Sequence, residues 1–262
     1  MNIRLHRIDA FTSRPFAGNP AAVCPLEKWL DEPVLRSIAI ETNQPATAFF
    51  AARNGAFEIR WFTPSVELDL CGHGTMASSY VLFTILEPSR KTARFMSRGG
   101  PLDVFMKEGR PVLDFPAIPL VRQHDPAIVA EALGATPLEL WEADRAMAIF
   151  ESERQIRALA PDTARVAALP FHSIIATAPG ERGTGVDLVS RFFAPKIGVP
   201  EDQVTGSSHC ILTPYWAKRL GKPRLFARQL SARGGELWLE DHATRVHLSG
   251  DCVAIASGAI SI

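Results

Sequence analysis

Two short segments of the sequence combine glycine with residues that can move protons or bind anions. Cys71-Gly-His-Gly-Thr75 places a thiol before a glycine and an imidazole between two glycines, and Thr205-Gly-Ser-Ser208 places hydroxyl groups around a glycine. A thiol at the start of a helix loses its proton more readily than a free thiol, and histidine is the usual proton-transfer group near neutral pH. Asp202 adds a carboxylate three residues before the second segment. These residue types indicate acid–base chemistry.

Both segments are also suited to binding an anion. A glycine turn that opens a helix leaves several backbone N–H groups without intrahelical partners, and the helix dipole favours negative charge there. A second interpretation is that both segments only start helices, with Cys71 as a small buried residue, His73 as a cap and Asp202 as a loop acceptor. The residue types alone leave both interpretations open. The candidate binding residues are Gly72, Gly74, Thr205, Gly206, Ser207 and Ser208.

The elements that must position these segments form an internal echo. Arg60-Trp-Phe-Thr-Pro64 precedes the first segment, and Arg191-Phe-Phe-Ala-Pro195 precedes the second. Each half is expected to contain a strand, a Phe-x-Pro turn, a loop, a glycine turn and a helix. The spacings differ, because nine positions separate Phe62 from Cys71 and twelve separate Phe193 from Thr205. The echo is either a coincidence or the trace of two homologous lobes whose glycine turns face each other across a cleft.

Periodicity predicts many strands and several short helices. Several strands adjoin without a helix between them, which favours α+β lobes with antiparallel or mixed sheets. No GxGxxG motif follows the first strand, so a dinucleotide-binding fold has no support. The expected strands are Ile3–Ile8, Ala48–Ala52, Phe57–Phe62, Leu102–Met106, Val112–Phe115, Ser173–Ala178, Val186–Phe192 and Ala243–Leu248. The expected helices are Glu32–Thr42, Thr75–Leu86, Asp125–Leu133, Thr136–Leu140, Ile156–Ala160, Thr163–Leu169 and Ser207–Leu220.

Composition limits the class of protein. The 262 residues are 47% apolar and 21% charged, and 28 Lys and Arg balance 28 Asp and Glu. A neutral chain gives no general electrostatic basis for binding nucleic acid or an anionic membrane. No stretch approaches about 18 uncharged apolar residues, and the N-terminus lacks the apolar core of a signal peptide. We therefore expect a cytoplasmic protein. Cys24, Cys71, Cys210 and Cys252 form no CxxC pair, which argues against a zinc site or a disulfide scaffold.

Several motifs in a fixed order resemble the phenazine-biosynthesis isomerase family (PhzF-like), relatives of the diaminopimelate epimerases. They run nearly end to end and begin with Asp9-Ala-Phe-Thr12, Pro15-Phe-x-Gly-Asn-Pro20, Phe62-Thr-Pro64 and Leu70-Cys-Gly-His-Gly-Thr75. They continue with Leu113-Asp-Phe-Pro116, Ser190-Arg-Phe-Phe-Ala-Pro195, Glu201-Asp202, Thr205-Gly-Ser207, Pro214-Tyr-Trp216 and Arg233-Gly-Gly235.

The resemblance implies a diaminopimelate epimerase-like α+β fold of two similar lobes, each a curved mixed or antiparallel sheet wrapped round a central helix. We expect an N-terminal lobe over residues 1–117 and a C-terminal lobe over 118–250, with a return of residues 251–262 to the first lobe left open. The resemblance also implies a homodimer and cofactor-independent isomerisation or epimerisation, with no metal. The substrate is expected to be a small carboxylated molecule bound between the lobes.

The resemblance assigns site residues one by one. The family's site histidine and its neighbouring glycine correspond to His73 and Gly72, and its aspartate corresponds to Asp202. Its Gly-Ser turn corresponds to Gly206 and Ser207, and its N-terminal asparagine to Asn19. Cys71 occupies the position of one catalytic thiol of the related epimerases. Thr205 replaces the second thiol, so a two-cysteine mechanism is not expected.

One departure affects the family's mechanism directly. The catalytic glutamate of the family lies in a stretch that here reads Asn43-Gln-Pro-Ala46-Thr-Ala-Phe49, so its position is Ala46. Glu41 is not expected to reach that position if the preceding helix ends near Thr42. A second departure is Gln203, where a proline usually follows the aspartate.

Three functions stay open. The first is an isomerase or related lyase that uses His73, Asp202 and Cys71. The second is a catalytically impaired anion-binding or regulatory protein, and the third is a scaffold without a ligand.

Overall fold

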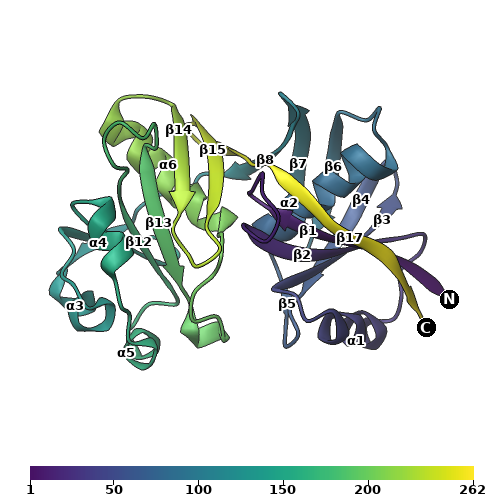
Figure 1. The fold of residues 1–262 in the computed structure, drawn as a ribbon, viewed down its shortest axis with the longest axis horizontal. Coiled ribbons are helices and arrows are strands. Elements are labelled where there is room, and N and C mark those ends of the chain that lie inside the picture. Colours follow the sequence, from purple (N-terminus) through teal and green to yellow (C-terminus); the bar gives the residue numbers. More distant parts are fainter. The chain divides into compact units, whose positions relative to one another are not determined.

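The protein has a mixed α/β fold that is rich in strands and has few helices (Figure 1). The computed structural model describes residues 1–262, and the chain divides into two compact units. The first unit comprises Met1–Phe115 and His247–Ile262, and the second comprises Pro116–Val246. The C-terminal strand therefore belongs to the unit that also holds the N-terminus.

The first unit contains most of the strands and three helical segments. Its strands are β1 (Asn2–Ala10), β2 (Asn19–Leu26), β3 (Ala46–Arg53), β4 (Ala56–Phe62), β5 (Glu67–Leu68), β6 (Thr92–Ser97), β7 (Gly100–Lys107), β8 (Arg110–Pro116) and β17 (Cys252–Ser261). Its helices are α1 (Glu32–Thr42), α2 (Gly72–Tyr80) and η1 (Val81–Leu86), a π-helical segment that directly continues α2.

The strands of the first unit form one mixed sheet around α2. β1 lies between β17 and β2, both antiparallel to it, while the pairs β2–β3 and β4–β6 are parallel. α1 packs on one face through a cluster that includes Leu35, Ile38 and Phe49. α2 packs against β1, β2 and β3, and every residue from Gly72 to Ser79 is buried. Such an all-round buried helix belongs to the interior of its unit.

The second unit has its own sheet and helices. Its strands are β9 (Arg122–His124), β10 (Glu139–Glu142), β11 (Ala146–Ile149), β12 (Ile174–Pro179), β13 (Leu188–Phe193), β14 (Arg224–Gln229), β15 (Gly235–His242) and most of β16 (Arg245–Ser249). Its helices are α3 (Ala127–Leu133), α4 (Glu153–Ala158), α5 (Thr163–Ala168), η2 (Pro195–Ile197) and α6 (Gly206–Leu220).

The order of strand orientations in the second unit repeats that of the first. β10–β11 is antiparallel, β11–β12 parallel, β12–β13 antiparallel, β13–β14 parallel and β14–β15 antiparallel. The first unit shows the same alternation from β1 to β7, if the two-residue β5 is set aside. The fourth strand of the series is β4 in the first unit and β13 in the second. The α-helix that follows each of them, α2 and α6, begins with a glycine turn. α6 packs against β14 and β15, and Trp216 on it donates a hydrogen bond to Thr177 (3.0 Å).

The structure corrects some predicted elements. The predicted helix Thr136–Leu140 is wrong, because Leu140 lies in β10 and pairs with both Ala148 and His124. Five residues that include Pro137 are too short to form a stable helix, and pairing on both sides favours the strand. Strands β2, β14 and β15 were not predicted, since their apolar residues are mixed with proline or charged residues.

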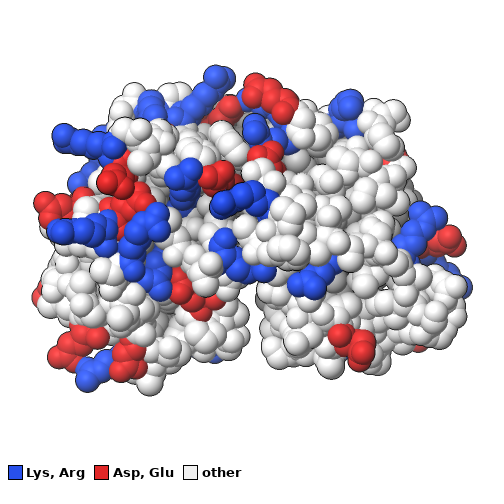
Figure 2. Space-filling model, in the orientation of Figure 1, with Lys and Arg blue, Asp and Glu red and all other residues white.

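No helix is both long enough and apolar enough to cross a membrane. Figure 2 shows charged side chains of both signs interspersed over the visible face of the second unit, and fewer on that of the first. Neither unit presents a large area of one sign on this face.

Candidate functional site

The first candidate segment forms the N-terminus of α2 and holds a thiol against an imidazole. Cys71 is the N-cap residue with extended backbone, and its Sγ accepts a hydrogen bond from the Gly74 amide at 3.4 Å. The same Sγ lies 3.5 Å from Nδ1 of His73. Both side chains are buried. The segment therefore places two proton-carrying groups in direct contact at a helix N-terminus, where negative charge on sulfur is stabilised.

Gly74 is required by packing rather than by its backbone angles. A Cβ atom at this position would lie 2.6 Å from Cδ1 of Trp61 and 3.0 Å from Sγ of Cys71. Trp61 is buried in β4, so it has little room to move. Any side chain at position 74 would therefore push the indole ring or the thiol out of place.

Asn19 and Ala46 begin two of the strands that pack against α2. Asn19 starts β2 and Ala46 starts β3, and both are fully buried. Ala46 is paired with Ala21, two residues after Asn19. Glu41 is exposed in the last turn of α1, which ends at Thr42 as predicted. Position 46, where the resemblance leads us to expect the family's glutamate, therefore holds a buried methyl group.

The loop before Asn19 is held by a carboxylate and a glycine. Oδ2 of Asp9 accepts a hydrogen bond from the backbone of Phe16 (2.9 Å). Gly18 has φ +65°, and a Cβ there would lie 2.2 Å from the carbonyl oxygen of Ala10. The N-terminal motifs therefore fix the direction in which the chain enters β2.

The second candidate segment forms the N-terminus of α6. Thr205 is the N-cap residue, and its hydroxyl donates a hydrogen bond to Oδ2 of Asp202 at 2.6 Å. The Ser208 hydroxyl donates to the Thr205 carbonyl at 2.8 Å. The structure thus brings Asp202, Thr205 and Ser208 together around the first turn of the helix. The backbone N–H groups of Gly206 and Ser207 lie in that first turn, where an α-helix offers no internal partners.

Two residues near the second turn were missed by the sequence analysis. Arg145 donates a hydrogen bond to Oγ of Ser207 (3.0 Å), and its guanidinium also pairs with Asp144. Gln229 contacts Thr205 and the Asp202 backbone. Neither lies in a local motif, since 62 and 24 positions separate them from Ser207 and Thr205. No sequence signal from a single chain joins residues so far apart.

The residues that follow the second turn are buried in α6. Nδ1 of His209 lies 2.9 Å from the Thr205 carbonyl, and burial lowers the pKa of His209 to about 4. Burial raises the pKa of the Cys210 thiol to about 12. Neither group changes its charge near neutral pH, which indicates a packing role for both.

Two further histidines lie beside acidic residues. His242 lies 3.4 Å from Glu240, and His247 lies 3.8 Å from Asp114. Glu240 and His242 are alternate residues of β15 and so share one face, whereas Asp114 and His247 lie in different strands, β8 and β16.

The echoed arginines make equivalent contacts in the two units. Arg60 binds both oxygens of Glu67 (2.7 and 2.7 Å) and lies 5.0 Å from the ring of Phe62. Arg191 binds both oxygens of Glu201 (2.7 and 2.9 Å) and lies 5.0 Å from the ring of Phe193. In each unit the two-point contact ties the strand to the segment that leads into the glycine turn.

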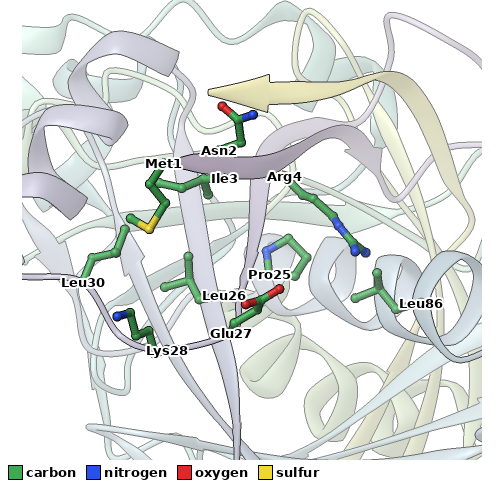
Figure 3. A pocket seen from close by; sticks show the side chains of 10 residues that line it. All are labelled: Met1, Asn2, Ile3, Arg4, Pro25, Leu26, Glu27, Lys28, Leu30 and Leu86. Carbon is green, nitrogen blue, oxygen red and sulfur yellow. The ribbon is translucent and has the colours of Figure 1, made fainter. Parts of the chain in front are cut away.

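A cavity of about 270 Å³ lies elsewhere in the first unit (Figure 3). It opens where β1 and β2 separate, because their pairing ends at His6 and Val23. None of the candidate site residues lines it. Its wall includes Ile3, Arg4, Leu26, Lys28, Leu30 and Leu86.

The chain is similar to known proteins over its full length. The sequence profile of the PhzC-PhzF family, described as phenazine biosynthesis-like proteins, matches residues 8–258. An uncharacterized isomerase of Pseudomonas aeruginosa is 47% identical over 263 residues, with 100% of both chains covered. The crystal structure of a PhzF-family phenazine biosynthesis protein from Enterococcus faecalis has a TM-score of 0.96 and 40% identity, again with 100% of both chains covered.

The fold extends to more distant proteins. A hydroxyproline epimerase of Agrobacterium vitis has a TM-score of 0.61 at 11% identity, over 99% of this chain and 91% of that one. At this level of identity the comparison shows a shared fold alone.

Proposed function

Because the chain belongs to the phenazine biosynthesis-like (PhzC-PhzF) family, we propose that it is a cofactor-independent isomerase acting on a small carboxylated substrate. The observation that carries the proposal is the contact between Cys71 and His73 at the N-terminus of α2. Burial excludes water from this pair, and the helix N-terminus favours the charge that proton transfer creates. Relatives named as isomerases support the same reaction class.

The proposed reaction moves one proton. A base, which is one of His73, Asp202 or the Cys71 thiolate, removes a proton from carbon next to the substrate carboxylate. The electron pair left behind forms an enolate, whose negative oxygen is stabilised by the backbone amides of a glycine turn, either that of Gly72 or that of Gly206. A protonated group then returns a proton to carbon, so atoms and charge balance without an external reactant. Arg145 and Ser207 would add charge and a hydroxyl at the carboxylate.

The similarity of the two units supports the fold expected from the family. We propose that the units are structural repeats, each built round a central helix, because strand orientations and the Arg–Glu contacts recur in both. The homodimer remains a prediction. Light scattering that gives a mass near twice 28.7 kDa would support it, and a mass near 28.7 kDa would contradict it.

Ala46 favours a second candidate function. A buried methyl group stands where the family has its proton-transferring glutamate, so the chain could bind the substrate class without turnover. Such a protein would bind small carboxylates and show no proton exchange. The same measurement separates the two candidates.

Deuterium incorporation from solvent tests the proposed function. Purified protein is incubated in D2O with a panel of small cyclic and amino carboxylic acids, and exchange at carbon is followed by proton NMR. We expect exchange in at least one acid, reduced at least about 100-fold in both His73→Ala and Asp202→Asn, the usual scale of general acid–base catalysis. Cys71→Ser should have a smaller effect, since Thr205 offers no second thiol. Full activity in either of the first two variants would remove that residue from the mechanism, and binding without exchange would favour the second candidate.

A further inference from the structure

Gln229, at the end of β14, is a buried amide whose three hydrogen bonds all go to the segment that carries Asp202. Its side chain is 1% exposed. Oε1 accepts a hydrogen bond from the Thr205 backbone N–H (2.8 Å). Nε2 donates to the Asp202 carbonyl (2.9 Å) and to the Thr205 hydroxyl (3.2 Å). One side chain therefore holds both ends of the turn before α6.

The backbone donors and acceptors determine how the Gln229 amide is oriented. The Thr205 N–H can only donate, so the group facing it must be Oε1. Nε2 must then face the Asp202 carbonyl, which can only accept. Because Nε2 also donates to the Thr205 hydroxyl oxygen, the single hydrogen of that hydroxyl is left for Oδ2 of Asp202, at 2.6 Å. The chain of donors runs from Gln229 through Thr205 to the Asp202 carboxylate.

We propose that Gln229 is a positioning residue, which fixes the Asp202 carboxylate and the amides of the α6 turn in the arrangement needed for proton transfer. The inference rests on the proposed function, since positioning matters only if Asp202 takes part in the reaction. Gln229 touches no substrate in this scheme. It acts through Thr205, because its hydrogen bond to the Thr205 hydroxyl fixes the direction in which that hydroxyl donates.

The neighbouring Gln203 adds two further contacts to the same turn. Its carbonyl accepts a hydrogen bond from the Ser231 hydroxyl (2.6 Å), and its Oε1 accepts one from the Arg233 backbone (3.3 Å). The proline usual at this position in the family has no side-chain acceptor. In this chain, side-chain contacts therefore tie residues 202–205 both to the end of β14 and to the loop that follows it.

Two variants of Gln229 and one control test the inference. Gln229→Leu removes all three hydrogen bonds, while Gln229→Glu keeps the acceptor for the Thr205 amide and replaces the donor by an oxygen. Thr177→Val is the control, because Thr177 is equally buried and makes two hydrogen bonds, to Val189 and from Trp216, away from the turn. All proteins are compared by melting temperature, by amide hydrogen exchange of residues 203–208, and by kcat and KM for the acid found in the exchange screen.

We expect Gln229→Leu to lower kcat at least about tenfold, equivalent to about 1.4 kcal/mol in the barrier, with KM changed less than about threefold. Exchange of the Thr205 amide should accelerate at least about tenfold, since its buried acceptor is lost. Gln229→Glu should keep that amide protected and still lose kcat, because the Thr205 hydroxyl now donates to the new carboxylate instead of Asp202. Thr177→Val should lower the melting temperature about as much as Gln229→Leu does, while its kcat stays within about twofold of wild type.

The outcomes separate the two hypotheses. If Gln229→Leu loses no more kcat than Thr177→Val, or if Gln229→Glu is fully active, Gln229 is only structural and the inference is wrong. If wild type exchanges no deuterium with any acid, the proposed function fails, and the inference about the reaction fails with it. In that case the amide hydrogen exchange of residues 203–208 still tests the structural part of the inference. If Gln229→Leu leaves it unchanged, Gln229 does not hold the turn.

Discussion

By resemblance, position 46 corresponds to the catalytic glutamate of the family, and in this chain it carries only a methyl group. Ala46 is fully buried at the start of β3, one of the strands that pack against α2. We expect Ala46→Glu to raise deuterium exchange at least about tenfold, a change of about 1.4 kcal/mol in barrier, because a buried carboxyl gains a pKa nearer the operating pH. Deuterium incorporation measured by proton NMR at equal protein concentration checks this.

Ala46→Gln is the matched control, since it has nearly the same shape but cannot accept a proton. A gain with Glu and none with Gln would assign the effect to proton transfer. A folded Ala46→Glu protein that binds carboxylates without any gain would mean that this position no longer adjoins the reacting carbon. Both variants should melt at lower temperature than wild type, because each buries a polar group in place of a methyl.

Some site residues are predictable from local sequence and others are not. Cys71 and His73 stand two positions apart beside glycines, so the local sequence indicates a helix start and makes both residues candidates for chemistry. Arg145 and Gln229 have no such signal, because they reach Ser207 and Thr205 only after β-strands have paired. Long-range hydrogen bonds of this kind depend on the register of a sheet, which one sequence does not specify.

The first turn of α6 is the element whose anion binding is simplest to test. Gly206 is the first helical residue, a position where proline is well tolerated, and Thr205 before it has the extended backbone that proline requires (φ −108°, ψ 95°). Gly206→Pro should therefore fold and yet lack one amide donor. If carboxylates raise the melting temperature of wild type, we expect the rise to disappear in this variant, as thermal titration with acetate and sulfate can show.

Gly206→Ala keeps the amide and serves as the control for adding a side chain. Its melting temperature should still rise with the anion. An equal rise in folded Gly206→Pro would locate the bound anion elsewhere on the protein.

The buried histidine of α6 predicts how stability depends on pH. The pKa of His209 falls from 6.5 to about 4 on folding because burial disfavours the charged ring. As the pH falls, His209 takes up its proton in the unfolded chain before it does so in the folded protein. The contribution of His209 to the free energy of unfolding is therefore fully present above about pH 6.5 and is lost as the pH falls towards 4. Between pH 7.5 and 4.5 the free energy of unfolding should drop by roughly 2 kcal/mol from this group alone.

Urea unfolding at the two pH values checks the prediction. His209→Gln should remove most of that drop, while the exposed His172→Gln should keep it. A smaller slope is expected to persist in His209→Gln, since burial also lowers the pKa of His6. Equal slopes in wild type and His209→Gln would show that His209 does not contribute.

At the level of elements, helices were predicted better than strands. α1 has the predicted ends, because Glu32 and Pro33 start a helix well and its apolar face is regular. β2 contains two prolines and was missed, although parallel pairing with β3 and antiparallel pairing with β1 both stabilise it. Pairing between distant segments overrides local preference in such strands.

For the molecule as a whole, the internal echo was the most informative sequence feature. In the sequence Arg60 and Arg191 are distinguished only by the repeated residues around them, yet each binds a glutamate and packs on a phenylalanine in its own unit. The echo left a coincidence and a repeat both open, and it did not indicate where each unit ends. The chain returns to the first unit at His247, and this depends on the pairing of β17 with β1, which leaves no mark in the composition of either segment.

The return of the C-terminus gives a prediction about the stability of the two units. β17 pairs with β1 from Ala10 back to Asn2, whereas the pairing of β1 with β2 stops at His6. Residues 2–5 therefore depend on β17 alone for their strand partners.

A protein truncated after Asp251 should lose protection from amide hydrogen exchange in β1 and β2 first, with exchange at least about tenfold faster there. Exchange in β12 and α6 of the second unit should change little. Removal of only Ser261 and Ile262 is the control and should affect little beyond the first residues of β1. Mass spectrometry of exchanged peptides measures both proteins. Equal loss of protection in both units after the longer truncation would mean that they unfold as one cooperative body, in which case the division of the chain describes its packing but not its stability.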